Sequence, residues 1–573
     1  MTGPALSPGH RAESVRRMAD EIFDIVVVGG GVTGAGAALD AATRGLSVAL
    51  VEARDYAAGA SSKSSKLIHG GLRYLEMGDF ALVRQALTER RLLLTALAPH
   101  LVKPVPFLWP LTHRLWERPY VGSGLLLYDT LGGARAVPRS RHLSRTGALR
   151  LAPALRPGSL VGAVQFYDAQ EDDARMVACL ARTAAWYGAA MATNIRVDGT
   201  LTRSGRVAGV LARDLLDGAD LEIRARHVVA ATGAWSPLAA GQELRVRPSK
   251  GVHIVVPRDR IKLRTGLLTR TGKSVLFVIP WGSHWLIGDT DTEWPHDPAG
   301  PAASRADIDY LLATVNHMLS DPLTDADIEG VFAGLRPLVA ARATADTTRL
   351  SREHTVDSSV PGLSVIAGGK YTTYRVMASD LIDAAAAGLA ALAGQAGRAV
   401  PRSRTHQVPL AGAAGYTERR SSRQQIAARS GLPASQVERL LGRYGADIDE
   451  LSDLIAARPE LGHVLPGSGG YLGAEIVYAC LAEGAVRLDD VLARRTRIAI
   501  EVPDRGREAA PHAAALMAAE LGWGEPRLAA EIGGYRRLVD AELAGQSQPD
   551  DLGAYQAVAA AADPVGFYRE RRS

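Results

Sequence analysis

Three glycines near the N-terminus have a spacing that suits phosphate binding. Gly29, Gly31 and Gly34 form a G-x-G-x-x-G pattern directly after the apolar residues 25–28. The first glycine of such a pattern permits a tight turn, the second lets the backbone approach a pyrophosphate, and the third lets a helix pack on the preceding strand. The helix N-terminus then offers N–H groups and a positive dipole end to the anion. The predicted dinucleotide site also includes Gly30, Val32 and Thr33.

The elements expected around these glycines support the prediction. Residues 23–28 read as a buried parallel strand, residues 35–44 as a helix and residues 46–52 as a second buried strand, so the segment spells one βαβ unit. An acidic residue that closes the second strand accepts hydrogen bonds from ribose hydroxyls and disfavours a 2′-phosphate. A glycine-rich turn in an unrelated α/β protein is the alternative, but it would not place these elements in register. The residues that this adds to the site are Glu52 and Ala53.

The next segment decides between a nicotinamide and a flavin dinucleotide. Residues 61–75 are rich in serine and glycine, which a plain nicotinamide-binding domain does not need. Their hydroxyl and backbone N–H groups suit a second contact with the pyrophosphate and ribityl chain of FAD. The sequence therefore predicts FAD as the cofactor. The further residues of this segment expected to contact it are Ser61, Ser62, Ser64, Ser65, Lys66, Leu67, His69, Gly70, Gly71 and Leu72.

The rest of the chain alternates between helical and strand patterns. Residues 99–119 contain prolines that interrupt regular structure, and residues 251–291 predict an antiparallel sheet that covers a substrate. Residues 415–544, rich in Ala, Leu, Arg and Glu, predict a separate helical domain. The other expected elements are helices over residues 80–97, 172–188 and 373–392 and buried strands over residues 225–231 and 363–367.

Several dispersed motifs resemble one known family. They are S-S-K-L-I-H-G-G-L-R-Y-L-E at 64–76, A-T-G-A-W at 231–235, S-K-G-V-H-I-V-V-P at 249–257, G-D-T-D at 288–291, L-R-P-L at 335–338 and G-G-K-Y-T-T-Y-R at 368–375. In this order, behind the glycine pattern, they are similar to the FAD-dependent glycerol-3-phosphate dehydrogenases of the respiratory type. The resemblance covers residues 23–392 well and the C-terminal region loosely. It implies an α/β fold: an FAD-binding Rossmann-like domain of the glutathione-reductase and D-amino-acid-oxidase type, an antiparallel β-sheet substrate domain and a C-terminal helical domain.

The length of 573 residues is too great for one hydrophobic core, so several domains are expected. The predicted parts are an N-terminal extension (1–20), an FAD-dependent oxidoreductase domain (21–395), a linker (396–414), a helical domain (415–545) and a C-terminal tail (546–573). Within the oxidoreductase domain, residues 21–79, 165–248 and 340–395 are expected to bind FAD, and residues 80–164 and 249–339 to cover the substrate.

The resemblance also implies a reaction and the residues for it. The expected substrate is sn-glycerol 3-phosphate, which is oxidised to dihydroxyacetone phosphate by hydride transfer to FAD, with the electrons passed to a membrane quinone. Guanidinium groups match phosphate oxygens bidentately. The further expected contacts of FAD are Thr232, Gly233, Gly369, Lys370 and Thr372. Lys370 would also bring positive charge to the flavin, where charge builds on reduction. The expected ligands of the substrate are Arg73, Tyr74, His253, Arg336, Arg352 and Lys370.

His253 is the first choice for the general base, because a neutral imidazole accepts a hydroxyl proton at neutral pH. A structural role for His253 stays open, and His69 in the predicted flavin loop is the competing base. Arg336 and Lys370 complete the expected catalytic group. The histidines show no metal-ligand spacing, so no metal is predicted.

The composition gives the expected surroundings of the protein. Lys and Arg number 66 against 61 Asp and Glu, a modest excess that favours an anionic substrate, a phospholipid surface or nucleic acid. No array of basic and stacking residues indicates nucleic-acid binding. The two cysteines, Cys179 and Cys480, provide no disulfide framework, and Arg16-Arg17 is not followed by the apolar stretch of an export signal. A cytoplasmic location is therefore expected.

A contact with the inner face of the cytoplasmic membrane is expected as well. No apolar run is long enough to span a bilayer. Residues 114–128 mix cations, aromatic residues and leucines as an interfacial segment does, and residues 135–150 add basic residues. A core helix with a basic flank would show the same pattern, and both interpretations stay open.

Other functions and a homodimeric state also stay open. An oxygen-dependent glycerol-3-phosphate oxidase would share the fold and the substrate residues, and a flavin oxidase for an amino acid or hydroxy acid would share the fold. A flavin-dependent redox sensor without turnover is the alternative from another class.

Overall fold

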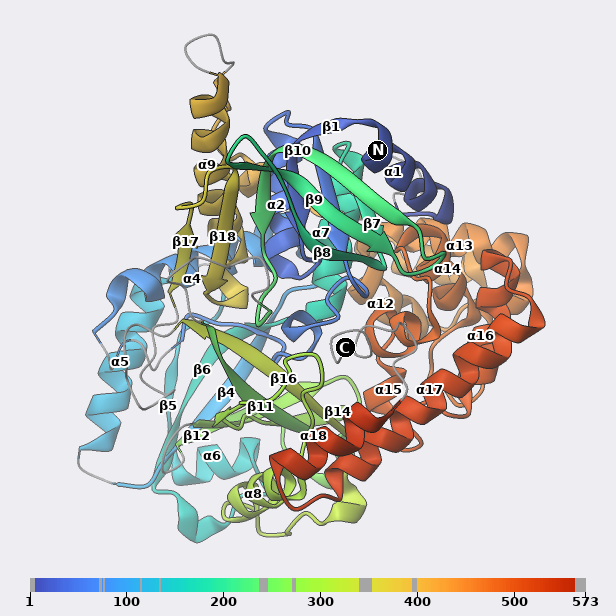
Figure 1. The fold of residues 1–573 in the computed structure, drawn as a ribbon. Coiled ribbons are helices and arrows are strands. Elements are labelled where there is room, and N and C mark those ends of the chain that lie inside the picture. The colour runs from blue at the N-terminus through green and yellow to red at the C-terminus, as the bar shows by residue number, and fades with distance from the viewer. Residues whose placement is uncertain are drawn as a thin grey trace.

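The structure is a computed structural model that describes residues 6–71, 75, 78–113, 116–132, 136–235, 246–270, 275–339, 353–393 and 399–561. Its first sheet is built on the predicted βαβ unit (Figure 1). Strand β1 (Ile22–Val28) pairs in parallel with β2 (Val48–Glu52) and β10 (Asp220–Ala230), and helix α2 (Val32–Thr43) connects β1 to β2. The order along the sheet is β17-β18-β10-β1-β2-β7, completed by β7 (Ala190–Thr193), β17 (His354–Asp357) and β18 (Leu363–Gly368).

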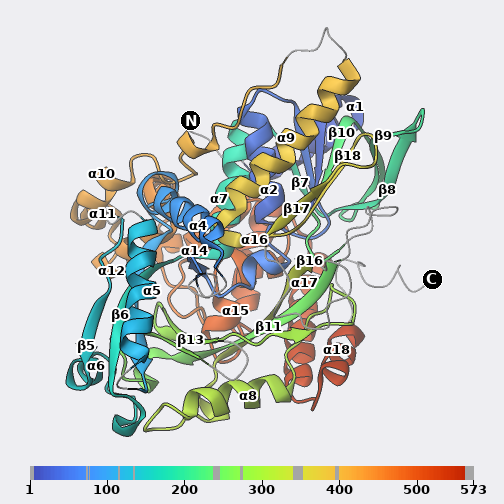
Figure 2. The ribbon, with the colours of Figure 1, turned by 90° about the vertical axis from the view of Figure 1, so that its left-hand side faces the viewer.

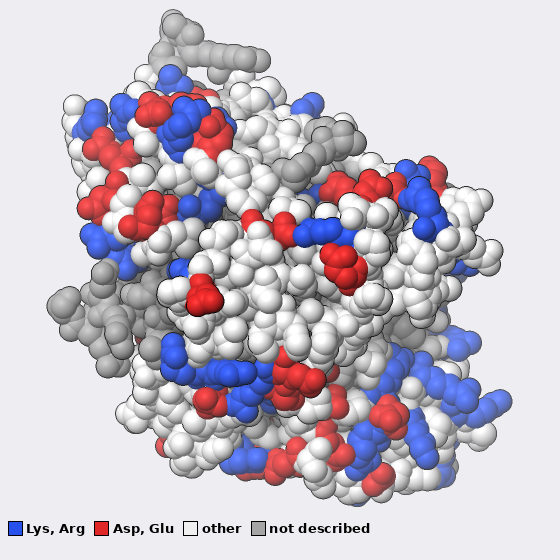
Figure 3. Space-filling model, turned by 90° about the vertical axis from the view of Figure 1, so that its right-hand side faces the viewer, with Lys and Arg blue, Asp and Glu red and all other residues white. Residues whose placement is uncertain are grey.

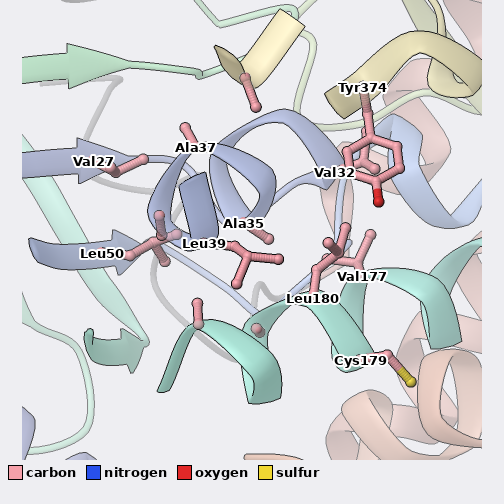
Figure 4. Close-up of a cluster of buried hydrophobic side chains, with 14 of the residues drawn as sticks. Val27, Val32, Ala35, Ala37, Leu39, Leu50, Val177, Cys179, Leu180 and Tyr374 are labelled. Atoms are coloured by element: carbon pink, nitrogen blue, oxygen red, sulfur yellow. The ribbon is translucent and has the colours of Figure 1, made fainter. Parts of the chain in front are cut away.

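Different layers cover the two faces of this sheet. Helices α2, α7 (Asp173–Trp186) and α9 (Tyr374–Ala393) pack on one face, where Ala35, Val177 and Leu381 are buried in one apolar cluster. Figure 4 shows part of this cluster, with Val27 and Leu50 of the strands directed at α2 and α7. The hairpin of β8 (Ile195–Arg203) and β9 (Arg206–Asp214), with α1 (Pro8–Asp20), covers the other face. The sheet is therefore buried on both sides, as its continuous apolar strands predict.

The second sheet has ten strands in the described part of the chain and forms the other wall of the molecule (Figures 1 and 2). Its order is β15-β11-β14-β13-β12-β4-β6-β3, with β16 paired to β11 and β5 paired to β6. The bounds are β3 (Leu67–Ile68), β4 (Lys103–Leu111), β5 (Arg141–Ser144), β6 (Gly162–Gln170), β11 (Val246–Pro257), β12 (Gly266–Arg270), β13 (Val275–Trp281), β14 (His284–Gly288), β15 (Thr292–Glu293) and β16 (Gly330–Val339). Neighbouring strands are antiparallel except β4 and β12, which are parallel.

The expectation that residues 99–119 interrupt regular structure is wrong, because β4 occupies most of that stretch. Its prolines, Pro104, Pro106 and Pro110, are separated by even numbers of residues. In an antiparallel ladder only every second residue of a strand donates its N–H group to a given neighbouring strand. Because all three prolines of β4 stand at even-numbered positions, the hydrogen bonds from the alternate residues to β6 stay intact. On its other edge β4 pairs with β12 only through Phe107 and Leu108. Proline content alone does not reveal this arrangement.

Helices surround the second sheet and form the C-terminal domain. Around the sheet lie α4 (Phe80–Leu92), α5 (Glu117–Leu131), α6 (Arg145–Leu151) and α8 (Arg305–Asn316). The C-terminal helices are α10 (Tyr416–Ser421), α11 (Arg423–Ser430), α12 (Ala434–Tyr444), α13 (Ile448–Ala457), α14 (Gly473–Ala482), α15 (Ile498–Glu501), α16 (Ala509–Leu521), α17 (Glu525–Gln546) and α18 (Asp551–Ala560). Helix α18 lies in the segment predicted as a tail. It is anchored because Asp551 pairs with the buried Lys250 of β11 at 2.5 Å.

Buried ion pairs join the C-terminal domain to the first sheet. Arg175 of α7 binds Glu483 at 2.5 Å, and Arg182 of the same helix binds Asp447 at 2.5 Å. Asp55, which follows β2, binds both Arg494 and Arg495. A buried charge is costly unless it is paired and hydrogen-bonded, so these pairs fix how the domain docks. Figure 3 shows the surface on the side of the C-terminal helices, where the described Asp and Glu side chains lie among Lys and Arg side chains.

Candidate active site

A cavity of about 740 Å³ lies between the two sheets, at the carboxyl ends of the parallel strands. Residues of β1, β2 and β18 line one side, and residues of β11 and β16 line the other. Ligands of open α/β sheets bind at this edge of the strands. The fold therefore brings the predicted nucleotide motif and three of the predicted substrate residues, His253, Arg336 and Lys370, to one cavity.

The glycine motif forms a cradle for a pyrophosphate. Gly29 has a left-handed φ of 111°, and a Cβ there would lie 2.5 Å from the carbonyl oxygen of Ala231. A Cβ on Gly34 would lie 1.9 Å from the carbonyl oxygen of Gly29, so α2 packs directly on the turn. Gly31 is the N-cap of α2 and offers no capping side chain, which leaves first-turn N–H groups for an anion. These features fit a bound dinucleotide.

Glu52 lies at the end of β2 beside this cradle. Its carboxylate accepts hydrogen bonds from the backbone N–H groups of Gly30 at 2.6 Å and Arg54 at 2.8 Å. Burial raises its pKa above the usual value, although both hydrogen bonds act in the opposite direction. Each carboxylate oxygen keeps a further acceptor site, so the group can also receive ribose hydroxyls.

The serine-rich loop follows the cradle and is fixed from several sides. The hydroxyl of Ser61 accepts from the backbone N–H of Val32 at 3.0 Å, which ties the loop to the start of α2. The hydroxyl and N–H of Ser64 both donate to Asp173, at 2.7 and 3.0 Å. Lys66 is fully buried and donates to Asp173 at 2.8 Å, so its side chain supports the loop and does not face the cavity.

Most of the residues predicted from the sequence line the cavity. They are Gly29, Gly31, Val32, Thr33, Glu52, Ala53, Ser61, Ser62, Ser64, Ser65, Leu67, His69, Thr232, Gly233, His253, Arg336, Gly369, Lys370 and Thr372. The predicted residues that do not line it are Gly30, Gly34, Lys66, Gly70 and Gly71. The predicted residues Leu72, Arg73, Tyr74 and Arg352 lie outside the described residues.

Arg336 lies on β16 with its guanidinium group in a polar setting. It forms an ion pair with Asp289 and donates to the carbonyl oxygen of Thr290 at 2.9 Å and to the hydroxyl of Ser249 at 3.3 Å. A second carboxylate, that of Asp291, lies 3.6 Å away. The carboxylates of Asp289 and Asp291 therefore orient the guanidinium group of Arg336. The sequence predicted Arg336 as a phosphate ligand but did not predict these acidic partners.

His253 lies on β11, next to the same group. Its ring stacks on Phe332 with a centroid distance of 4.9 Å and an interplanar angle of 8°, and its Nε2 lies 3.0 Å from the hydroxyl of Ser65. The side chain is 1% exposed, and burial lowers the pKa of the imidazole to about 4, partly offset by the charge of Asp289. The ring is therefore neutral at physiological pH. Nδ1 has no hydrogen-bond partner among the described residues.

Lys370 reaches the cavity from the end of β18. The two preceding residues, Gly368 and Gly369, have left-handed φ angles of 77° and 90°, which turn the chain toward the cavity. Next to them, the hydroxyl of Thr372 accepts from the backbone N–H of His69 at 3.1 Å. The loop that carries Lys370 therefore meets the serine-rich loop.

Other lining residues were missed by sequence reasoning. Asp289 stands in a motif quoted for the resemblance, but nothing in the pattern indicated that it pairs with Arg336. Residues 195–198 of β8 also line the cavity, although the sequence predicted no element or site residue there. Arg494, Arg497 and Tyr535 bring the C-terminal domain to the cavity. No local motif marks them, because their role depends on domain docking. Among the described residues, no cluster of His, Cys, Asp and Glu could hold a metal ion.

Comparisons with known proteins agree with this description. A family model described as "FAD dependent oxidoreductase" matches residues 24–375, and one described as "C-terminal domain of alpha-glycerophosphate oxidase" matches residues 403–528. The chain is 53% identical over 555 residues to glycerol-3-phosphate dehydrogenase 2 of Mycobacterium tuberculosis, which covers 96% of this chain and 94% of the relative. It is 35% identical over 592 residues to the mitochondrial glycerol-3-phosphate dehydrogenase of Bos taurus, which covers 98% of this chain and 79% of that protein.

A solved structure extends the comparison to three dimensions. The glycerol-3-phosphate dehydrogenase from Bacillus halodurans, complexed with FAD, matches with a TM-score of 0.77 and 28% identity, over 95% of this chain and 99% of that chain.

The fold, the glycine cradle and the family match together define an FAD-dependent oxidoreductase of the D-amino-acid-oxidase type. The identity to its relatives over almost the whole chain is more specific. The chain belongs to the FAD-dependent glycerol-3-phosphate dehydrogenase family. The predicted family, fold class and cofactor are thereby confirmed.

The cradle gives a test with a matched control. Gly34→Ala places a methyl group against the Gly29 carbonyl oxygen, whereas Gly124→Ala in α5 meets no atom within 4 Å. Helix propensity favours alanine at both positions, so only close packing distinguishes them. We expect Gly34→Ala to be purified with little or no FAD, and Gly124→Ala to retain it, as measured by the flavin released per protein chain. A full complement of FAD in Gly34→Ala would contradict the cradle.

Proposed function

We propose that this protein oxidises sn-glycerol 3-phosphate at C2 to dihydroxyacetone phosphate, with FAD as the acceptor of the hydride. The observation that supports this most is the convergence of His253, Arg336 and Lys370, from three separate segments, on the cavity that also contains the glycine cradle. FAD supplies a two-electron acceptor there, and the side chains supply substrate binding and proton transfer. The names of the relatives agree with this substrate.

The cations would bind the phosphate of the substrate. Arg336 has a planar fork of donors that is held in place by Asp289, Thr290 and Ser249. Such orientation reduces the entropy that phosphate binding costs, although the two nearby carboxylates offset part of the charge. Lys370 adds a second positive group at the same cavity. Arg73, Tyr74 and Arg352 stay proposed ligands on the resemblance alone.

His253 would accept the hydroxyl proton as C2 is oxidised. A base must be unprotonated before the reaction, and its lowered pKa keeps the imidazole neutral throughout the neutral pH range. Among the described residues only Nε2 of the ring has a hydrogen-bond partner, the hydroxyl of Ser65, so the other ring nitrogen is left as a site for a proton. His69 also lines the cavity and stays the competing base.

Replacement of Arg336 tests the phosphate site. Arg336→Ala removes a charged hydrogen-bonding group, so we expect KM for glycerol 3-phosphate to rise by about 10- to 100-fold, with FAD still bound. Arg247→Ala is the control, because Arg247 lies on the adjacent strand β11 but pairs with Glu293 and does not line the cavity. Steady-state kinetics on both variants give the result. An unchanged KM in Arg336→Ala would remove Arg336 from the substrate site.

Replacement of His253 tests the base. His253→Gln keeps a polar side chain but cannot take up the proton, so we expect flavin reduction in a single turnover to slow by about 100-fold or more without loss of FAD. In the parent protein the acid limb of this rate should lie nearer pH 4 than pH 6.5, since burial lowers the pKa of His253 to about 4. His69→Gln is the parallel variant. Reduction at the parent rate in His253→Gln, with slow reduction in His69→Gln, would reassign the base.

A membrane quinone is the proposed acceptor of the electrons, reached at the inner face of the cytoplasmic membrane. No described helix of the structure is long and apolar enough to cross a membrane. Helix α5 buries Val121, Leu125 and Tyr128 on one side, while large apolar residues on its other side face outward. These exposed residues are Trp116, Tyr120, Leu126 and Leu127, of which Leu126 is 65% exposed.

The surroundings of α5 suit an anionic lipid surface. Strand β5 lies beside it and leads into helix α6, and the two elements carry Arg141, Arg145 and Arg150 (Figure 2). The packing is direct, since a Cβ on Gly122 of α5 would lie 2.6 Å from the ring of His142. Aromatic and leucine side chains beside cations are typical of an interfacial contact. This outward face of α5 is the proposed membrane contact.

Flotation with liposomes tests that contact. We expect the parent protein to float with vesicles that contain anionic lipid, and the double variant Leu126→Gln/Leu127→Gln to float less. Leu211→Gln is the control, because Leu211 is 44% exposed on β9, in the other sheet. No association of the parent protein with either neutral or anionic vesicles would contradict the proposal, as would equal loss in the control.

An oxygen-dependent oxidase is the second candidate, because the model that matches the C-terminal region is named for an oxidase. Hydrogen peroxide formed in air, measured against the rate with a soluble quinone, separates the two acceptors.

A further inference from the structure

Three parts of the cavity wall converge on one buried residue, Asp173, the first residue of α7. The serine-rich loop binds its carboxylate through Ser64 and Lys66. The loop that carries Lys370 binds it as well, because the hydroxyl of Tyr371 donates to the Asp173 carbonyl oxygen at 2.6 Å. The C-terminal domain contributes the third contact, an ion pair from Arg497.

Arg497 uses its whole guanidinium group at this point. It binds Asp173, donates to Asp172 at 2.5 Å, and reaches the carbonyl oxygen of Ser62 at 3.4 Å. The side chain is 2% exposed, and the residue also lines the cavity. Arg497, a residue of the C-terminal domain, therefore contacts both the carboxylate of Asp173 and the backbone of the serine-rich loop. A lysine in its place could not reproduce this fork of donors.

The serine-rich loop needs this support. Lys66 has a left-handed φ of 56°, a conformation that a side chain other than glycine adopts only when its surroundings hold it. Its N–H donates to the hydroxyl of Ser64 at 3.0 Å, and its ammonium group donates to the Ser62 carbonyl oxygen at 3.1 Å and to Asp173. Without Arg497, the buried acids would keep fewer partners and the loop would lose one of its restraints.

The restraint extends to the expected base. Ser65, between Ser64 and Lys66, forms the hydrogen bond to His253 Nε2. The ammonium group of Lys66 lies 5.0 Å from the ring centre of Phe332, the residue on which His253 stacks. The same loop conformation therefore sets one side of the His253 ring and the part of the cavity wall that would contact the flavin.

We infer that Asp173 and Arg497 are positioning residues of the cofactor site, and that Arg497 makes the C-terminal domain part of FAD binding. Arg497 holds Asp173, and Asp173 holds the loops of residues 62–66 and 369–372 against the cavity. The expected effect of Arg497 on FAD affinity rests on the family of the protein and on the cavity. The expected effect of Arg497 on proton transfer by His253 rests on the proposed function.

The test compares two buried ion pairs on the same helix. Arg497→Gln breaks the pair at the start of α7, and Arg497→Lys keeps the charge without the fork. Asp447→Asn is the matched control, because it breaks the Arg182–Asp447 pair of 2.5 Å, which also joins α7 to the C-terminal domain but involves no cavity residue. For each protein we would measure the thermal midpoint, the dissociation constant for FAD, and the visible circular dichroism of bound flavin.

We expect Arg497→Gln and Asp447→Asn to lower the thermal midpoint, but only the Arg497 variants to weaken FAD binding, by about 10-fold for a lost charged hydrogen bond, and to alter the flavin dichroism. If Arg497→Gln does not fold, Arg497→Lys gives the same comparison with a smaller loss. FAD affinity and dichroism that equal those of Asp447→Asn would overturn the inference and leave Arg497 as a domain contact only.

A kinetic measurement addresses the link to His253. Arg497→Lys, saturated with FAD, should be reduced more slowly by glycerol 3-phosphate, with KM within about twofold of the parent value. Because the FAD measurements use no substrate, they stand even where the proposed substrate is wrong. An unchanged reduction rate would remove the link between Arg497 and His253.

Discussion

The pairing of buried charges that joins the C-terminal domain to α7 and to the end of β2 is the constraint on which the rest of the structure depends. Charges removed from water are stable only with well-placed partners, so the arginines at 175, 494, 495 and 497 must meet their acids together. This requirement selects one docked position of the domain. In that position Arg497 reaches Asp173, and Asp173 fixes the loops that face the cavity. We therefore infer that the docking of the C-terminal domain and the binding of FAD depend on the same buried contacts of Arg497 and Asp173.

The cavity follows from the meeting of two different sheets. The parallel strands of the first sheet present the glycine turn and Glu52 at their carboxyl ends, where a dinucleotide fits the backbone. The antiparallel strands β11 and β16 present His253 and Arg336 opposite them. Neither sheet carries a complete site. A substrate with a phosphate and an alcohol would contact both kinds of group at once, which is the arrangement that the proposed reaction needs.

Local patterns predicted much of this arrangement, and contacts between distant residues account for the rest. The βαβ unit and the glycine cradle depend on residues that are close together in the sequence, and the elements predicted for them agree with the structure at residues 22–52. Sequence motifs also predicted that His253, Arg336 and Lys370 belong to one site, and all three line the cavity. The pairing of Arg336 with Asp289, the burial of Lys66 and the role of Arg497 were not predictable, because each depends on a partner that only the fold brings near. Strand β4 was missed because its prolines are harmless only in the observed ladder.

The most direct test of the account is anaerobic reduction of the bound flavin by candidate substrates. With excess glycerol 3-phosphate, the visible absorption band of the oxidised flavin should bleach within one turnover, while glycerol, which lacks the phosphate, and lactate, a hydroxy acid, should leave it intact over the same time. Bleaching by glycerol 3-phosphate alone is the predicted result. An intact band with glycerol 3-phosphate, or equal bleaching by glycerol, would contradict the proposed substrate.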